Sequence, residues 1–348
     1  MRLAAIEVIP YALPFKEPYV TARGVLQRRE MVLLRVRDED GVVGLGEAVP
    51  LSLRGGVGLA EVVRELEGWA ERQEVEGLSA PARCAVATAR MDLLGRRAGS
   101  GGSAKDEAVA CNATLVAGAP EAVAAEAERW AADGFTTFKL KLGAESVKNL
   151  VEQGKSRTRV HDVEQVRAVR EAIGPSARIR VDANAAWDLE TAQRRLGELE
   201  SYGIELAEQP VATLEEMADL AESTSIPLAA DESVASLEEA ERAAAMGACA
   251  YTGIKLSKVG GPEAALAIAD VLPAFITSAL DGPVGIATAG RVAQTVGGSL
   301  AHGLATQRLF AETIASVECE LRDGMLHLPP DPGLGVEIDE EALRAHRL

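Results

Sequence analysis

The chain has 348 residues, of which 47% are apolar and 26% are charged, a composition typical of a globular protein with one or two domains. Only 3% of the residues are aromatic, so we expect an aliphatic core, as in parallel α/β proteins. The formal net charge of −17 argues against nucleic acid and against an anionic membrane surface as partners, but it is compatible with a small anionic substrate.

The first part of the chain predicts a small α+β domain over residues 1–107. Three strands come first and two helices follow them, at 2–13, 31–37, 42–47, 59–72 and 79–95. Strands that precede helices, without alternating with them, indicate an α+β arrangement. Residues 19–24 and 50–58 are expected to be long, mobile loops, and the Gly- and Ser-rich residues 98–104 mark the boundary region.

From about residue 108 strands and helices alternate, which predicts an α/β domain over residues 108–317. The expected strands are 109–115, 135–142, 177–184, 204–209, 227–232, 249–256, 274–279 and a short one near 302–306. The expected helices are 119–133, 161–173, 188–201, 213–223, 236–246, 261–270 and 284–297. This order fits a TIM-like barrel, whose active site lies at the C-terminal ends of the strands. A doubly wound open sheet is the alternative, and no Gly-x-Gly-x-x-Gly motif supports it.

The last segment, residues 318–348, contains a strand pattern at 321–328 and a glycine-rich turn at 333–336. We expect this segment to lie outside the barrel and to return to the N-terminal domain.

Three carboxylates end three successive strands of the expected barrel. Asp182, Glu208 and Asp231 are 26 and 23 residues apart, which is about the length of one strand-and-helix unit. Residues at the same place in successive units converge on one point of a barrel. We interpret that point as a divalent metal site.

Lysines flank these carboxylates in the order of the strands. Lys139 and Lys141 alternate with Leu140 on the second strand, so both are expected on its inward face. Lys255 follows one unit after Asp231, on the sixth strand. A solvated edge strand with two surface lysines is the alternative for the first pair.

The residue types point to metal-assisted proton abstraction. Monodentate carboxylates suit Mg²⁺, with Mn²⁺ as a substitute, and such a metal can clamp a substrate carboxylate. A lysine beside a metal loses its proton more readily, which suits a general base. Asn184 and Glu232 are expected to orient the groups of this site.

Four cysteines at positions 84, 111, 249 and 319 show no paired spacing, so we expect free thiols and a cytoplasmic location. Neither a signal peptide nor an apolar run of membrane-spanning length is expected. The sequence does not determine the oligomeric state and is compatible with a homo-oligomer.

The motifs together resemble the enolase superfamily and, more narrowly, its muconate lactonizing enzyme subgroup. They are Phe138-Lys139-Leu140-Lys141, Asp182-Ala183-Asn184, Glu208-Gln209-Pro210, Asp231-Glu232-Ser233 and residues 254–261, Ile-Lys-Leu-Ser-Lys-Val-Gly-Gly. The resemblance covers essentially the whole chain. It implies a (β/α)7β barrel with an N-terminal α+β capping domain that the C-terminal tail completes.

The resemblance also implies roles for the residues. The three carboxylates would bind Mg²⁺, and Lys141 and Lys255 would flank the α-carbon of a small carboxylate substrate, whose proton is removed to give an enediolate. The two loops of the cap would close over the substrate and help to set specificity. Candidate substrate contacts are Thr21, Arg23, Ser52, Ser278 and Asp281.

Within the subgroup, residues 277–281, 284–286 and 302–306 are similar to o-succinylbenzoate synthases, which implies dehydration of a cyclohexadiene carboxylate in menaquinone synthesis. Muconate cycloisomerisation, N-succinylamino acid racemisation and dipeptide epimerisation are the alternatives. Dipeptide epimerases usually show an Asp-x-Asp in the last strands, and only Asp281 is present here. The polar loop at 144–160 is unusually long for the family.

Two other classes of function remain open from the residues themselves. A Schiff-base aldolase can use a lysine on the sixth strand of a barrel, and EDTA would not inhibit it. A non-catalytic barrel is the third hypothesis, although degenerate barrels are expected to lose some metal ligands.

Overall fold

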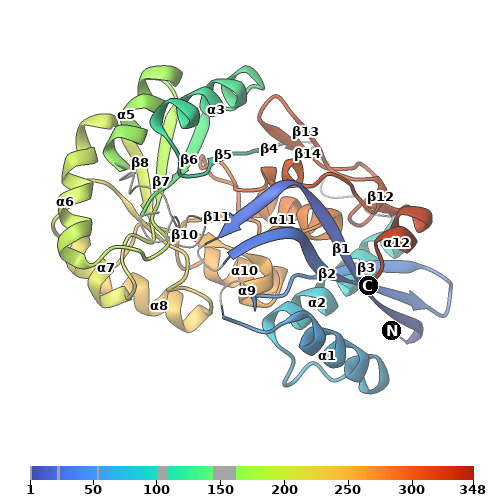
Figure 1. Ribbon diagram of the computed structural model, residues 1–348. Coiled ribbons are helices and arrows are strands. Elements are labelled where there is room, and N and C mark those ends of the chain that lie inside the picture. Colours follow the sequence, from blue (N-terminus) through green and yellow to red (C-terminus); the bar gives the residue numbers. More distant parts are fainter. Residues whose placement is uncertain (1, 22–23, 53–54, 100–107, 144–161) are drawn as a thin grey trace.

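A three-stranded antiparallel sheet opens the chain in the computed structural model, which describes residues 2–21, 24–52, 55–99, 108–143 and 162–348 (Figure 1). Its strands are β1 (Leu3–Thr21), β2 (Gly24–Asp38) and β3 (Val43–Ala48), in that order across the sheet. Helices α1 (Leu59–Arg72) and α2 (Ala80–Ala98) cover one face of this cap sheet.

Strand β2 is buried on both faces because its side chains alternate between two cores. Val32, Leu34 and Val36 pack with the apolar faces of α1 and α2, whereas Met31 and Leu33 belong to the large cluster that extends through the barrel. The cap sheet is therefore packed between its own helices and the barrel.

The expected mobile loop at 19–24 is wrong where the structure describes it. Residues 19–21 pair with the start of β2, so the two strands continue as one long hairpin. The ring of Tyr19 stacks on Phe15 with centroids 5.3 Å apart, and Phe15 stacks on Phe310 at 5.1 Å. This aromatic packing supports the strands beyond the point where their sequence alternation ends.

The second part of the chain forms a parallel barrel, which confirms the predicted fold class. Its seven-stranded sheet runs in the order β5 (Ala113–Leu115), β6 (Thr137–Lys141), β7 (Arg178–Asp182), β8 (Ile204–Glu208), β9 (Leu228–Ala230), β10 (Tyr251–Ile254) and β11 (Ala274–Ile276). The helices are α3 (Pro120–Ala132), α5 (Asp162–Ile173), α6 (Leu189–Leu199), α7 (Leu214–Ala221), α8 (Leu237–Met246), α9 (Leu256–Val259), α10 (Pro262–Ala269) and α11 (Pro283–Val296). Short 3-10 helices lie at η3 (Glu200–Tyr202) and η4 (Ala305–Leu309).

Residues 302 and 303 close the barrel between its first and last strands. His302 forms a parallel bridge with Cys111, and Gly303 forms one with Thr277. Backbone hydrogen bonds of 2.7 Å to Ala110 and 2.8 Å to Ile276 hold the two sides together. The expected strand at 302–306 is therefore shorter than predicted, because the chain enters η4 at Ala305.

The short helix α9 replaces the end of the predicted sixth strand. Two glycines follow it with left-handed φ values, +101° at Gly260 and +122° at Gly261. A Cβ at Gly261 would lie 3.1 Å from the Cβ of Ala87 and 3.4 Å from the Cα of Cys84, both on α2. The glycines thus allow the barrel to approach the cap helix closely.

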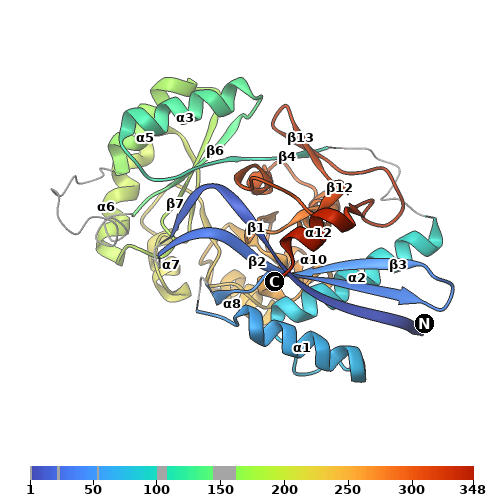
Figure 2. The same ribbon diagram turned by 45° about the vertical axis from the view of Figure 1, so that its right-hand side comes forward.

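The C-terminal segment contacts both parts of the chain (Figure 2). Strands β13 (Glu320–Arg322) and β14 (Met325–His327) extend β4 (Val109–Ala110), and β12 (Ala315–Val317) pairs with β15 (Glu337–Ile338). Helix α12 (Glu340–His346) lies beside β1, where the backbone N–H of Leu348 donates to Pro10 at 3.0 Å. On these contacts we propose the division into a cap (1–107), a barrel (108–317) and a returning segment (318–348). Within the described ranges, no helix is long and apolar enough to cross a bilayer.

Candidate active site

The three carboxylates lie at the C-terminal ends of three adjacent barrel strands. Asp182 is the last residue of β7 and pairs in register with Glu208, the last residue of β8, and Asp231 directly follows β9. All three are at most 1% exposed. Parallel strands whose ends meet at one edge bring these side chains to the same end of the barrel.

Lysine ammonium groups hold each of these carboxylates. Nζ of Lys139 lies 2.9 Å from Asp182 and 3.0 Å from Glu208, and Nζ of Lys141 lies 2.5 Å from Asp182. On the other side, Lys255 forms an ion pair with Asp231. The structure therefore places two lysines of β6 and one lysine after β10 on opposite sides of the carboxylate group.

The two lysines of β6 differ in exposure and in electrostatics. The Lys139 side chain is 8% exposed, and that of Lys141 is 25% exposed. Burial alone would lower the pKa of Lys139, but Asp182 and Glu208 outweigh it and raise that pKa above its usual value. Lys139 is thus held as a cation beside Asp182 and Glu208.

The carboxylates influence one another as well as the lysines. Burial raises the pKa of Glu208 and the charge of Asp182 raises it further, against the opposing effect of Lys139. Burial alone would also raise the pKa of Asp182, but Lys139 and Lys141 hold it below its ordinary value. The site concentrates negative charge that cations must balance.

The residues that follow the strands orient this group. Asn184 has a left-handed φ of 47°, and its backbone N–H donates to Asp182 at 3.0 Å. The Asn184 side chain accepts from Lys141 at 2.8 Å and donates to Glu232 at 3.1 Å. Asn184 thus contacts both Lys141 and Asp182, whereas Glu232 contacts Asn184.

Two further residues touch the site and were not singled out from the sequence. Gln209 is fully buried with a φ of 39°, and its side-chain oxygen Oε1 accepts from the backbone N–H of Asp231 at 2.8 Å. Nζ of Lys258 lies 3.0 Å from Asp231. Lys258 reaches Asp231 because α9 places it one helical turn after Lys255, and no sequence signal for α9 was recognised.

The carboxylates fit a hard divalent cation by their chemistry. In the described part of the chain, no group of three His, Cys, Asp or Glu side chains has the geometry of a metal site. Lysine ammonium groups lie against Asp182, Glu208 and Asp231. Burial and then the charges of Asp182 and Asp231 raise the pKa of Glu208, so Mg²⁺ would stabilise this set of three oxygen donors. Asp182, Glu208 and Asp231 are the residues that would hold it.

The substrate candidates of the barrel form a closed turn after β11. The hydroxyl of Ser278 donates to Asp281 at 2.6 Å and accepts from Thr306 at 2.8 Å. The Asp281 carboxylate, 7% exposed, also accepts from the backbone N–H of Ala279 at 2.7 Å. Oδ2 is thus directed into the turn, whereas Oδ1 accepts from the hydroxyl of Ser257 at 3.4 Å.

The candidate substrate contacts of the cap lie within the two predicted loop segments, at 19–24 and 50–58. Ser52 is exposed, and its carbonyl oxygen accepts from the N–H of Gly55 at 3.2 Å. Thr21 is the last residue of β1, but its side chain lies outside the described residues, as do Arg23 and the loop at 144–160.

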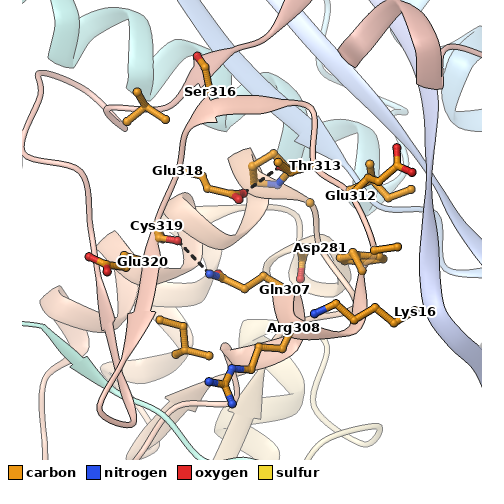
Figure 3. A pocket seen from close by; sticks show the side chains of 17 residues that line it. Lys16, Asp281, Gln307, Arg308, Glu312, Thr313, Ser316, Glu318, Cys319 and Glu320 are labelled. Atoms are coloured by element: carbon orange, nitrogen blue, oxygen red, sulfur yellow. Dashed lines mark hydrogen bonds between the residues drawn. The ribbon is translucent and has the colours of Figure 1, made fainter. Parts of the chain in front are cut away.

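A cavity of about 670 Å³ lies beside this turn (Figure 3). Its lining includes Lys16 of β1, Asp281, Arg308 and Gln307, whose side chain donates to the carbonyl of Cys319 at 2.9 Å. The lysines and carboxylates of the strand ends do not line this side cavity.

Two family profiles match the chain. "Mandelate racemase / muconate lactonizing enzyme, N-terminal domain" matches residues 5–68, and "Enolase C-terminal domain-like" matches residues 122–342. A capped barrel with lysines and carboxylates at its strand ends agrees with both, and the chain belongs to the enolase superfamily. Within that superfamily it is a member of the muconate lactonizing enzyme subgroup.

Relatives in the subgroup carry out different reactions. The o-succinylbenzoate synthase of Thermobifida fusca (strain YX) is 38% identical over 208 residues, which cover 59% of this chain and 61% of that protein. Muconate cycloisomerase 1 of Pseudomonas putida is 30% identical over 97% of this chain and 96% of that protein. The solved dipeptide epimerase from Enterococcus faecalis V583, complexed with Mg and the dipeptide L-Leu-L-Tyr, has the same fold, with a TM-score of 0.86 at 24% identity over 97% of this chain and 100% of that one.

Proposed function

We propose that the chain is a Mg²⁺-dependent o-succinylbenzoate synthase, a carbon–oxygen lyase that dehydrates 2-succinyl-6-hydroxy-2,4-cyclohexadiene-1-carboxylate in menaquinone synthesis. The observation that carries the proposal is the placement of Lys141 and Lys255 on opposite sides of three buried carboxylates. The 38% identity to a synthase over part of the chain supports the particular reaction.

The lysines have separate tasks in this proposal. Lys141, the more exposed lysine of β6, removes the α-proton, and the electrons of the broken C–H bond pass into the substrate carboxylate. Lys255, whose side chain is 6% exposed, holds the developing negative charge by its ammonium group. Lys139 stays protonated and balances Asp182 and Glu208.

The second half of the reaction returns the proton. The enediolate electrons re-form the carboxylate and expel the β-hydroxyl, and the ammonium of Lys141 protonates this leaving group, so that water is released. Mg²⁺, when bound, supplies a Lewis acid that stabilises negative charge on the substrate carboxylate.

A muconate cycloisomerase is the second candidate, because the 30% match to that enzyme spans nearly the whole chain. Racemisation of N-succinylamino acids and epimerisation of dipeptides use the same proton abstraction. A Schiff-base aldolase, in a different class, would be trapped on Lys255 by borohydride and would be indifferent to EDTA.

One experiment separates these candidates. The protein is incubated with Mg²⁺ in D₂O with the cyclohexadiene carboxylate, N-succinylamino acids, dipeptides or muconate, and each mixture is followed by proton NMR. The proposal predicts rapid dehydration of the cyclohexadiene carboxylate to an aromatic product. Turnover of another compound in its place would assign a different reaction of the subgroup.

A further inference from the structure

A buried carboxylate of the cap joins the cap sheet to the barrel. Glu47 of β3 is 2% exposed and lies against the first turn of α11. It accepts hydrogen bonds from the Tyr11 hydroxyl at 2.9 Å and from the backbone N–H of Gly282 at 2.7 Å. The backbone of Gly285 also donates to it.

The Glu47 carboxylate occupies space that side chains at Gly282 and Gly285 would otherwise fill. A Cβ at Gly282 would lie 2.7 Å from Oε2 of Glu47, and a Cβ at Gly285 would lie 2.6 Å from Oε1. Real Cβ atoms essentially never approach other atoms so closely, so a side chain at either position would force Glu47 to shift from this place. The contact joins residues 235 positions apart in the chain.

The anchored segment is continuous with the turn that carries the substrate candidates. Asp281 directly precedes Gly282, and a Cβ at Gly285 would lie 2.8 Å from the Cβ of Asp281. Arg29 of β2 supplies a second link, since its guanidinium donates to the carbonyl of Pro50 at 2.7 Å and to that of Ala279 at 3.2 Å. The cap therefore forms hydrogen bonds with the turn at Ala279 and with Gly282, directly after it.

We infer that Glu47 is a positioning residue. By accepting the N–H groups of Gly282 and Gly285, it fixes the turn at 278–281 against the cap and so sets how the barrel holds its substrate. The effect on substrate rests on the function proposed above, whereas the effect on the turn does not.

The charges around Glu47 make its hold on the helix sensitive to pH. Burial, together with the charge of Asp281, raises the pKa of Glu47 to about 7. The other titratable groups that face it are Tyr11 on β1, Arg29 on β2 and Cys84 on α2. Because the folded-state pKa of Glu47 lies above its ordinary value, protonation stabilises the anchored state, so the anchor strengthens as the pH falls through about 7.

The test measures amide hydrogen exchange and steady-state kinetics in the full chain. Glu47→Gln replaces one acceptor by an amide donor, so the amides of residues 282–285 should lose about tenfold in protection, while those of α7 should not change. KM for the substrate should rise about tenfold, with a much smaller change in kcat. The matched control is Glu30→Gln, at a solvent-accessible position of β2, where Glu30 pairs with Arg28.

The pH dependence gives a readout that a merely structural role would not change. In the wild type, the protection factors at residues 282–285 should rise as the pH is lowered through about 7, and Glu47→Gln should remove this titration. Tyr11→Phe deletes a hydrogen bond that lowers the pKa of Glu47, so it should shift the midpoint upward. This variant keeps the inference testable if Glu47→Gln does not fold.

Unchanged protection at residues 282–285 in folded Glu47→Gln, or an unshifted midpoint in Tyr11→Phe, would overturn the inference. A fall in kcat at constant KM would overturn its substrate part. If the wild type turned over none of the substrates tested by NMR, the proposed function would fail, and the exchange data would still decide the role of Glu47.

Discussion

The ammonium of Lys139 donates to both carboxylate oxygens of Glu208, at 3.1 and 3.0 Å, although both side chains are almost wholly buried. Lys139→Met would leave Glu208 and Asp182 without this countercharge. Breaking a buried ion pair costs about 3 to 5 kcal/mol, so we expect a loss of this size in the free energy of unfolding. Urea denaturation measures it, and Lys141→Met, at a more exposed lysine, should lose less; equal stability of Lys139→Met and the wild type would contradict the assignment.

The carboxylates of the strand ends are expected to bind Mg²⁺. EDTA should abolish turnover and added Mg²⁺ should restore it. Asn184→Ala, which removes contacts with Lys141 and Glu232, should weaken Mg²⁺ binding by about ten- to a hundredfold. Glu208→Gln should weaken it further, as measured by calorimetry, and wild-type affinity in Glu208→Gln would exclude this residue as a ligand.

The raised pKa of Glu47 has a consequence for stability. Its folded-state pKa is about 7 against an ordinary value of 4.5, so the folded protein binds the extra proton between these values. Stability should therefore be highest below about pH 4.5 for this group and fall as the pH rises to about 7, by about 3 kcal/mol. The difference in unfolding free energy between the wild type and Glu47→Gln, measured across this range, isolates the effect. A difference that does not vary with pH would show that Glu47 does not titrate there.

Gly261 joins the end of α9 to the cap helix. Gly261→Ala places a side chain at a φ of +122° and 3.1 Å from the Cβ of Ala87, so we expect a loss of about 1 to 3 kcal/mol. The matched control is Gly197→Ala in α6, where a Cβ would meet nothing within 4 Å. That change should stabilise the protein by about 0.5 to 1 kcal/mol, because alanine suits a helix interior. Melting temperatures that move in the same direction for both variants would argue against close docking at Gly261.

Much of the fold follows from local sequence patterns. Helix α1 has the predicted bounds, and the barrel strands and helices lie near their predicted positions because each shows its own periodicity. The hairpin tip at 19–21 and helix α9 were missed, since aromatic stacking on Phe310 and close contact with α2 hold them in place. Both contacts join residues that are distant in the chain.

In the candidate site, too, the residues that depend on long-range contacts could not be predicted from local sequence patterns. Asp182, Glu208 and Asp231 could be recognised because strand ends converge in any parallel barrel. Gln209 could not be assigned, because its role depends on a left-handed backbone and on the amide of Asp231. The role of Glu47 likewise depends on a contact with α11 that no local pattern predicts.

Lys141 as the general base is tested by the turnover of the cyclohexadiene carboxylate by Lys141→Ala in the presence of Mg²⁺. Lys16→Ala, at a cap lysine that lines the side cavity, is the matched control, and circular dichroism checks that both variants fold. Lys141→Ala should lose about a thousandfold or more in kcat, since it lacks the general base, while Lys16→Ala should retain activity. Wild-type turnover by folded Lys141→Ala would contradict this role of Lys141.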